Sequence, residues 1–69
     1  TTQDFVVWVL RSVFRKAEEE AVRIMLDVHR RGKGVAGIYA FDVADTKIAQ
    51  VKELAERNEF PLLCTLAPD

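Results

Sequence analysis

The stretch from Glu18 to Gly32, EEEAVRIMLDVHRRG, constrains the fold of this chain more than any other part of it. Its apolar residues recur every three or four positions, which is the period of a helix with one buried face. Glutamates fill the first turn and arginines the last, and this order complements the helix dipole. Gly32 stands where helices often end in a left-handed conformation. The stretch therefore predicts a helix that buries its apolar face against another element.

Two further stretches have the same helical period. In TTQDFVVWVLRSVF the apolar positions repeat at steps of three and four, although the β-branched and aromatic residues would also suit a strand. We predict a helix over residues 2–14, capped by Thr1 or Thr2. In DVADTKIAQVKELAERN we predict a helix that begins with Asp42 as its cap and ends at Asn58.

The segments beside the third helix favour strands. GKGVAGIYAF, residues 32–41, contains three glycines, which would weaken a helix. PLLCTL, residues 61–66, begins with Pro61 at a position where a strand tolerates the missing N–H. These elements predict one α+β domain over residues 1–69, with helices on one face of a small sheet. Because two strands make a thin sheet, we expect a third strand upstream of Thr1.

The composition argues against several classes of function. The chain has 10 basic and 11 acidic side chains, so neither nucleic acid nor a membrane is expected as a partner. The single cysteine, Cys64, cannot form an internal disulfide, which fits a reducing cytosol. The single histidine, His29, cannot build a zinc site alone, and no glycine motif for phosphate is present. We therefore expect no enzyme, no metal site and no cofactor.

Two side chains keep alternative interpretations when only the residues are considered. His29 could interact with the carbonyls at the end of its helix. It could also lie on the rim of an apolar groove between the first two helices and bind a small polar group beside an apolar side chain. Trp8 could form a contact site for a partner or pack under an N-terminal segment.

Three strings together resemble the ClpS family of bacterial adaptors: FVVWVL, IMLDVHRRGKGVAGIY and VADTKIAQVKELAERNEFPLLCTL. These adaptors deliver N-degron substrates to the ClpA–ClpP protease. The match runs over essentially the entire chain, in order and at matching spacing. It implies an α+β sandwich of three helices on an antiparallel sheet of three strands, with the first strand missing from this chain. It also implies a cytoplasmic bacterial protein.

The resemblance implies a pocket between the first two helices for the N-terminal residue of a substrate, with a preference for Leu, Phe, Tyr or Trp. His29 matches the family histidine that hydrogen-bonds the free α-amino group. The family's Asn-Asp-Asp motif, which completes this amine site, would precede Thr1 and is absent from this chain. The other positions that correspond to the pocket are Thr1, Gln3, Val6, Ile24, Met25, Val28 and Leu62.

Gln3 departs from the family, which usually has a methionine there as a gate against β-branched residues. This difference suggests a gate-variant paralogue with altered selectivity.

The resemblance also implies docking to the N-terminal domain of the ClpA-type unfoldase. Asp42, Asp45 and Lys47 match the family segment that makes this contact. The alternative is an interaction module like the C-terminal domain of the ribosomal stalk, which would recruit a partner without recognising N-termini. A pocket too shallow for leucine between the first two helices would favour that alternative.

Overall fold

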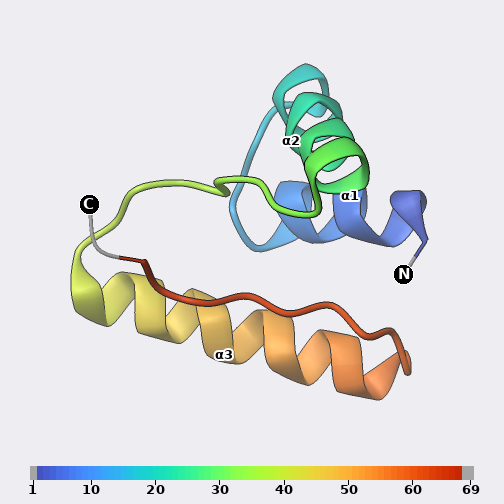
Figure 1. Ribbon diagram of the computed structural model, residues 1–69. Coiled ribbons are helices and arrows are strands. Elements are labelled where there is room, and N and C mark those ends of the chain that lie inside the picture. Colours follow the sequence, from blue (N-terminus) through green and yellow to red (C-terminus); the bar gives the residue numbers. More distant parts are fainter. Residues whose placement is uncertain (1, 68–69) are drawn as a thin grey trace.

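The computed structural model of the chain describes residues 2–67, and these form three helices (Figure 1). The helices are α1 (Gln3–Ser12), α2 (Glu18–Arg31) and α3 (Phe41–Arg57). All three form where the helical period predicts them. α1 ends two positions before the predicted limit at residue 14, and α3 begins one position before Asp42.

The cap of α1 is Thr2, whose hydroxyl oxygen accepts a hydrogen bond of 3.2 Å from the backbone N–H of Phe5. The prediction of a threonine cap is thus confirmed for Thr2, while Thr1 lies outside the described residues. Beyond the helix, Arg15 has a φ of 56°, so the chain turns in a left-handed conformation before it enters α2.

The end of α2 also follows the prediction. Gly32 has a φ of 80°, and its N–H donates a hydrogen bond of 2.9 Å to the carbonyl of Val28. In α3, Asn58 is the C-cap as predicted, but the N-cap is Ala40. The prediction that Asp42 caps α3 is therefore wrong. Asp42 lies in the first turn, where its carboxylate still complements the positive end of the helix dipole.

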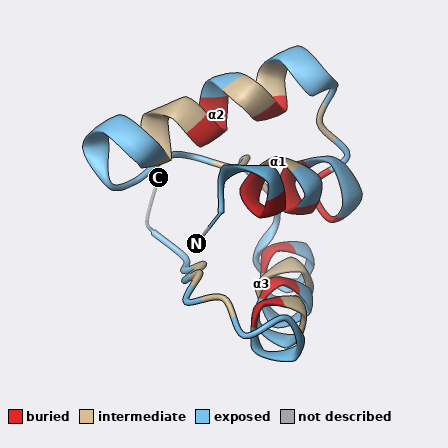
Figure 2. Ribbon diagram, turned by 90° about the vertical axis from the view of Figure 1, so that its right-hand side faces the viewer, coloured by how far each residue is buried: buried red, intermediate tan, exposed pale blue. Residues whose placement is uncertain are grey.

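The core lies where α1, α2 and α3 face one another. Figure 2 shows the buried residues of α2 on the side that faces α1. Aromatic rings extend this core to the later segments, because the ring centroids of Phe5 and Phe60 are 4.6 Å apart. The buried members of the core are Phe5, Val6, Val9, Leu10, Val13, Phe14, Ala21, Ile24, Met25, Val51 and Ala55.

The predicted sheet does not form, so the α+β class is wrong for this structure. Residues 2–67 contain no strand, and within this range no backbone hydrogen bond joins residues 33–40 to residues 60–67. Both segments run as irregular connections, and residues 60–67 return from the end of α3 towards its start (Figure 1). The glycines of the first segment and Pro61 in the second lower the propensity for strands.

The alternation expected of a strand is nevertheless present in the last segment. Phe60, Leu62 and Cys64 are half-buried against the core, whereas the residues between them are exposed. In the earlier segment, Ala36 and Tyr39 contact the core instead, three positions apart. Burial against the helices therefore orders the two segments without backbone pairing between them.

Candidate functional site

The predicted peptide site occupies the start of α1 and the last turns of α2, together with one position after α3. Val6, Ile24 and Met25 are at most 8% exposed and belong to the core. Val28 and Leu62 are half-buried. The structure therefore divides the predicted residues into a buried group and an accessible group. Thr1, which was predicted to line the same site, lies outside the described residues.

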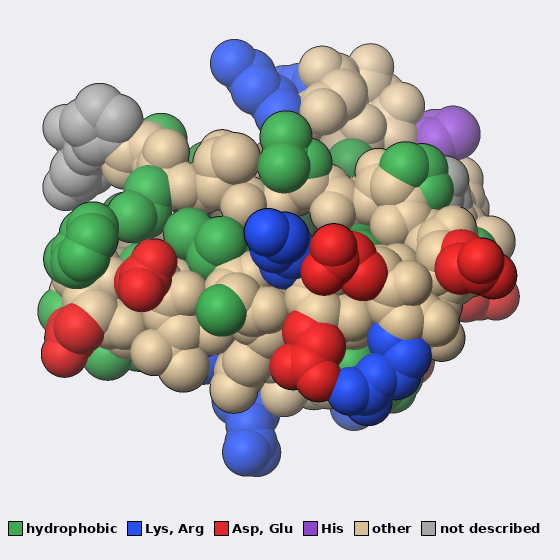
Figure 3. Space-filling view, turned by 90° about the horizontal axis from the view of Figure 1, so that it is seen from below, with side chains coloured by type: hydrophobic (Ala, Val, Ile, Leu, Met, Phe, Trp, Pro, Cys, Tyr) green, Lys and Arg blue, Asp and Glu red, His purple; other side chains and the backbone are tan. Residues whose placement is uncertain are grey.

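His29 lies in the last turn of α2 and is exposed, next to the half-buried Val28. The histidine, purple in Figure 3, is visible at the surface. The chain passes close to this turn after it leaves the helix. A Cβ added at Gly34 would lie 3.1 Å from Cγ2 of Val28 and 3.2 Å from the carbonyl oxygen of Ile24. The end of α2 thus carries a polar side chain beside an apolar one, under a close turn of the backbone.

Two shallow depressions lie along α3, and neither is lined by the predicted peptide-site residues. They share Gln50. The first has a volume of about 300 Å³ and is lined by Asp42, Val43, Thr46, Lys47 and Gln50. The second has a volume of about 350 Å³ and is lined by Ser12, Val13, Gln50, Glu53, Leu54 and Arg57.

The three predicted docking residues do not all point to solvent. Asp42 and Asp45 are exposed in the first turns of α3. Lys47 is half-buried, and its Nζ donates a hydrogen bond of 2.7 Å to the backbone carbonyl of Val13. The same ammonium lies 5.2 Å from the ring centroid of Tyr39, which suits a cation–π contact. The charge of Lys47 is therefore engaged inside the molecule.

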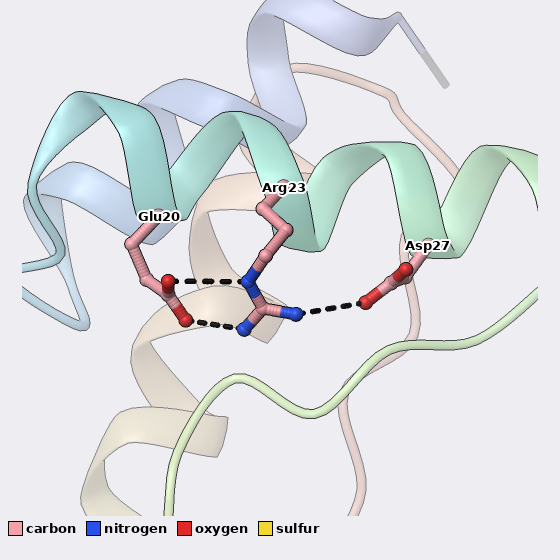
Figure 4. A network of polar contacts seen from close by, with 3 residues as sticks. All are labelled: Glu20, Arg23 and Asp27. Atoms are coloured by element: carbon pink, nitrogen blue, oxygen red, sulfur yellow. Dashed lines mark hydrogen bonds and ion pairs between the residues drawn. The ribbon is translucent and has the colours of Figure 1, made fainter.

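An ionic network covers the outer side of α2 (Figure 4). Arg23 donates hydrogen bonds from Nε to Glu20 over 3.1 Å and from Nη1 to Asp27 over 3.3 Å, and its Nη2 also pairs with Glu20. The hydrogen bonds from Arg23 lower the pKa of Glu20, and those to Glu20 raise the pKa of Arg23. Arg23 is exposed, Glu20 and Asp27 are partly exposed, and the three side chains pair with one another at the surface of the helix.

Burial raises the pKa of the Cys64 thiol, which keeps it protonated and weakly nucleophilic. Within residues 2–67, no three histidine, cysteine, aspartate or glutamate side chains stand close enough to hold a metal ion. In the same range, no helix has the length and apolar character needed to cross a membrane.

Comparison with known proteins places this arrangement in a family. The family described as "ATP-dependent Clp protease adaptor protein ClpS" matches residues 1–65. The chain belongs to the ClpS family. The resemblance seen in the sequence is thereby confirmed.

Individual ClpS proteins are similar over nearly the whole chain. The protein named "ATP-dependent Clp protease adapter protein ClpS" from Syntrophus aciditrophicus is 56% identical over 66 residues, which are 96% of this chain and 62% of that protein. The protein of the same name from Acetivibrio thermocellus is 54% identical over 69 residues, which are 100% of this chain and 70% of that protein. The chain thus spans about two thirds of the length of these relatives.

Sequence reasoning missed two features of this ClpS chain. The first is the inward contact of Lys47, because Val13 stands 34 positions away and no local pattern connects them. The second is Phe41, which was assigned to a strand and is instead the exposed first residue of α3. The helical period of the apolar residues also fits a helix that begins at Phe41, so this pattern could have assigned Phe41 to α3.

Proposed function

We propose that this ClpS chain is an adaptor. It binds the free N-terminal Leu, Phe, Tyr or Trp of a substrate and delivers that substrate to a ClpA–ClpP-type protease in the bacterial cytoplasm. The observation that carries the proposal is the family match over residues 1–65, which includes His29 at the exposed end of α2. The relatives are named as adapter proteins, which supports an adaptor rather than an enzyme.

In this proposal His29 accepts a hydrogen bond from the substrate's α-ammonium group. An ammonium has three N–H donors and a positive charge, so it requires acceptors in a negative field. A neutral imidazole offers one acceptor nitrogen, and a protonated one offers none. The last carbonyls of α2 lie in the same turn and form the negative end of the helix dipole. His29 must therefore be neutral when it binds.

The first side chain of the substrate would lie against the accessible residues of the site. We assign the rim to Gln3, Val28 and Leu62. The buried residues Val6, Ile24 and Met25 would form the floor. Burial of a large apolar side chain contributes about 1.5–3 kcal/mol, whereas a charged side chain would lose its hydration without gaining a partner. This difference explains a preference for bulky apolar residues.

The proposed docking surface for the unfoldase is the start of α3, with Asp42, Asp45 and Lys47. The two aspartates are exposed and can meet a partner directly. Because the ammonium of Lys47 is engaged with Val13, this lysine would act by holding α3 in place.

The test compares a labelled peptide that begins with Phe and its N-acetylated twin, by fluorescence anisotropy with the complete protein. We expect micromolar or tighter binding of the free peptide and much weaker binding of the acetylated one. His29→Ala should weaken only the free peptide, and Arg30→Ala, an exposed neighbour, is the matched control. Equal binding of both peptides by the unaltered protein would refute recognition of the α-amino group.

One observation favours the second candidate, an interaction module that recruits a partner without recognising N-termini. The first depression along α3 is lined by Asp42 and Lys47 of the predicted docking residues, so this helix offers a concave surface to a partner. That candidate predicts binding of a protein partner together with no binding of either peptide. The anisotropy pair therefore separates the two functions in one measurement.

A further inference from the structure

Phe41, the first residue of α3, leaves a large aromatic side chain in water. It is 72% exposed. Its spacing places it on the same side of α3 as the buried residues Ala44, Val51 and Ala55, but at the first position of the helix it lies beyond the buried part of that side. Aromatic residues are enriched in protein interfaces and depleted from open surfaces. Val35, Ile38 and Leu63 are exposed to a similar or greater degree, and Phe41 differs from them because it is an aromatic residue on a helix.

Acidic side chains stand beside this aromatic residue. Asp42 and Asp45 are exposed in the first turns of the same helix, and no ion pair among residues 2–67 involves either of them. Lys47, the first basic residue of α3, directs its ammonium to Val13. The helix dipole accounts for an aspartate in the first turn, but not for an exposed phenylalanine.

The apolar area continues into the first depression along α3. Val43 is 43% exposed and lines that depression together with Asp42 and Thr46. In Figure 3, hydrophobic and acidic side chains gather at the left, over the end at which α3 begins in Figure 1. An apolar centre with charged groups around it is the usual arrangement of a protein interface.

We infer that Phe41 is the apolar anchor of the surface that binds the protease partner. The partner face that fits has an apolar pocket with basic side chains around it. The pocket would take the phenylalanine ring, and the basic groups would meet Asp42 and Asp45. This inference rests on the proposed function and adds Phe41 and Val43 to the proposed docking surface.

The two parts of this surface have different kinetic effects. Removal of an anchor that is buried in the complex mainly speeds dissociation, and truncation of such anchors commonly weakens binding by ten-fold or more. Removal of a charge at the rim mainly slows association and reduces its dependence on salt. The anchor and the acidic rim can therefore be told apart by kinetics.

The test measures binding of the complete protein to an intact ClpA-type unfoldase by biolayer interferometry. Phe41→Ala is expected to weaken binding by about ten-fold or more, mainly through faster dissociation. Asp42→Asn is expected to slow association at low salt and to have little effect at high salt. Trp8→Ala is the matched control, because Trp8 is an aromatic residue 48% exposed on another helix. It should leave docking unchanged.

Each other outcome has a definite meaning. If the unaltered protein docks and Phe41→Ala docks equally well, the inference is wrong. If Phe41→Ala and Trp8→Ala weaken docking equally, the loss is general and the inference is again wrong. If the unaltered protein self-associates, and Phe41→Ala abolishes self-association but not docking to the unfoldase, the surface binds a second copy of the chain and the inference is wrong. The peptide assay should be unchanged by Phe41→Ala, so failure of peptide recognition is measured separately.

Discussion

The ammonium group of Lys47 donates a hydrogen bond of 2.7 Å to the backbone carbonyl of Val13, 34 positions earlier in the chain. Val13 is the C-cap of α1, where carbonyl groups lack a partner within the helix. The same ammonium stands over the rings of Tyr39 and Phe14, at 5.2 Å and 5.8 Å from their centroids. One side chain of α3 therefore contacts the end of α1 and the segment between α2 and α3.

Replacement of this lysine should destabilise the fold. Lys47→Met keeps most of the aliphatic stem and removes the charge and the donor. A hydrogen bond from a charged group contributes about 1.5–3 kcal/mol, so we expect the free energy of unfolding to fall by roughly 1–3 kcal/mol. Urea unfolding followed by circular dichroism measures the change. Lys52→Met, at an exposed position of the same helix, should change it by less than about 0.5 kcal/mol. Equal effects of both substitutions would contradict the role of Lys47.

Gly37 leaves room for the ring of Tyr39, which takes part in the same contact. A Cβ added there would lie 2.5 Å from Cε2 of Tyr39, so the ring must shift. Since Tyr39 lies under the ammonium of Lys47, Gly37→Ala should disturb the cation–π contact and lower the free energy of unfolding by about 1–3 kcal/mol. The control introduces Gly37→Ala into the Lys47→Met variant, which has already lost the cation–π part of the contact. The two effects should be less than additive in a double-mutant cycle, and strict additivity would contradict this coupling.

The helices could be predicted from the sequence because their signals are local. The period of the apolar residues, the threonine cap and Gly32 all act within a few positions of one another. The sheet could not be predicted correctly, because strand pairing depends on contacts between distant segments. Residues 60–65 do alternate between half-buried and exposed positions, yet no backbone pairing accompanies them among residues 2–67.

The candidate site was also predictable only in part. The identities of His29 and Gln3 follow from the motif, but their exposure depends on how α1 and α2 pack. The same packing buries Val6 and Ile24, which the motif alone places with the accessible residues.

Gln3 should determine how strictly the proposed pocket rejects β-branched residues. It is exposed at the start of α1, and its amide would lose hydrogen bonds to water against an apolar ligand. Gln3→Met restores the apolar tip found in the family, so we expect several-fold stronger discrimination of Leu over Ile and Val. Anisotropy with peptides that begin with these three residues measures the ratio. The control Gln50→Met, on α3, should leave the ratio of Leu to Ile and Val binding unchanged. If Gln3→Met also leaves this ratio unchanged, Gln3 does not act as a gate.

Because Glu20 is paired with Arg23 on α2, we expect the stability of the fold to depend on the pH through Glu20. One substitution should remove this dependence. Hydrogen bonds from Arg23 lower the pKa of Glu20 in the folded protein. A group with a lowered pKa stabilises the fold above its unfolded pKa, and this contribution is lost as the pH falls through its folded pKa. Arg23→Gln should raise the pKa of Glu20 towards its ordinary value and flatten this part of the pH profile. NMR titration of the Glu20 carboxyl carbon measures the shift. Arg57→Gln, which removes the pair with Glu53 on α3, should leave the pKa of Glu20 unchanged. If the Glu20 titration is the same in Arg23→Gln as in the unaltered protein, the network does not hold this carboxylate in solution.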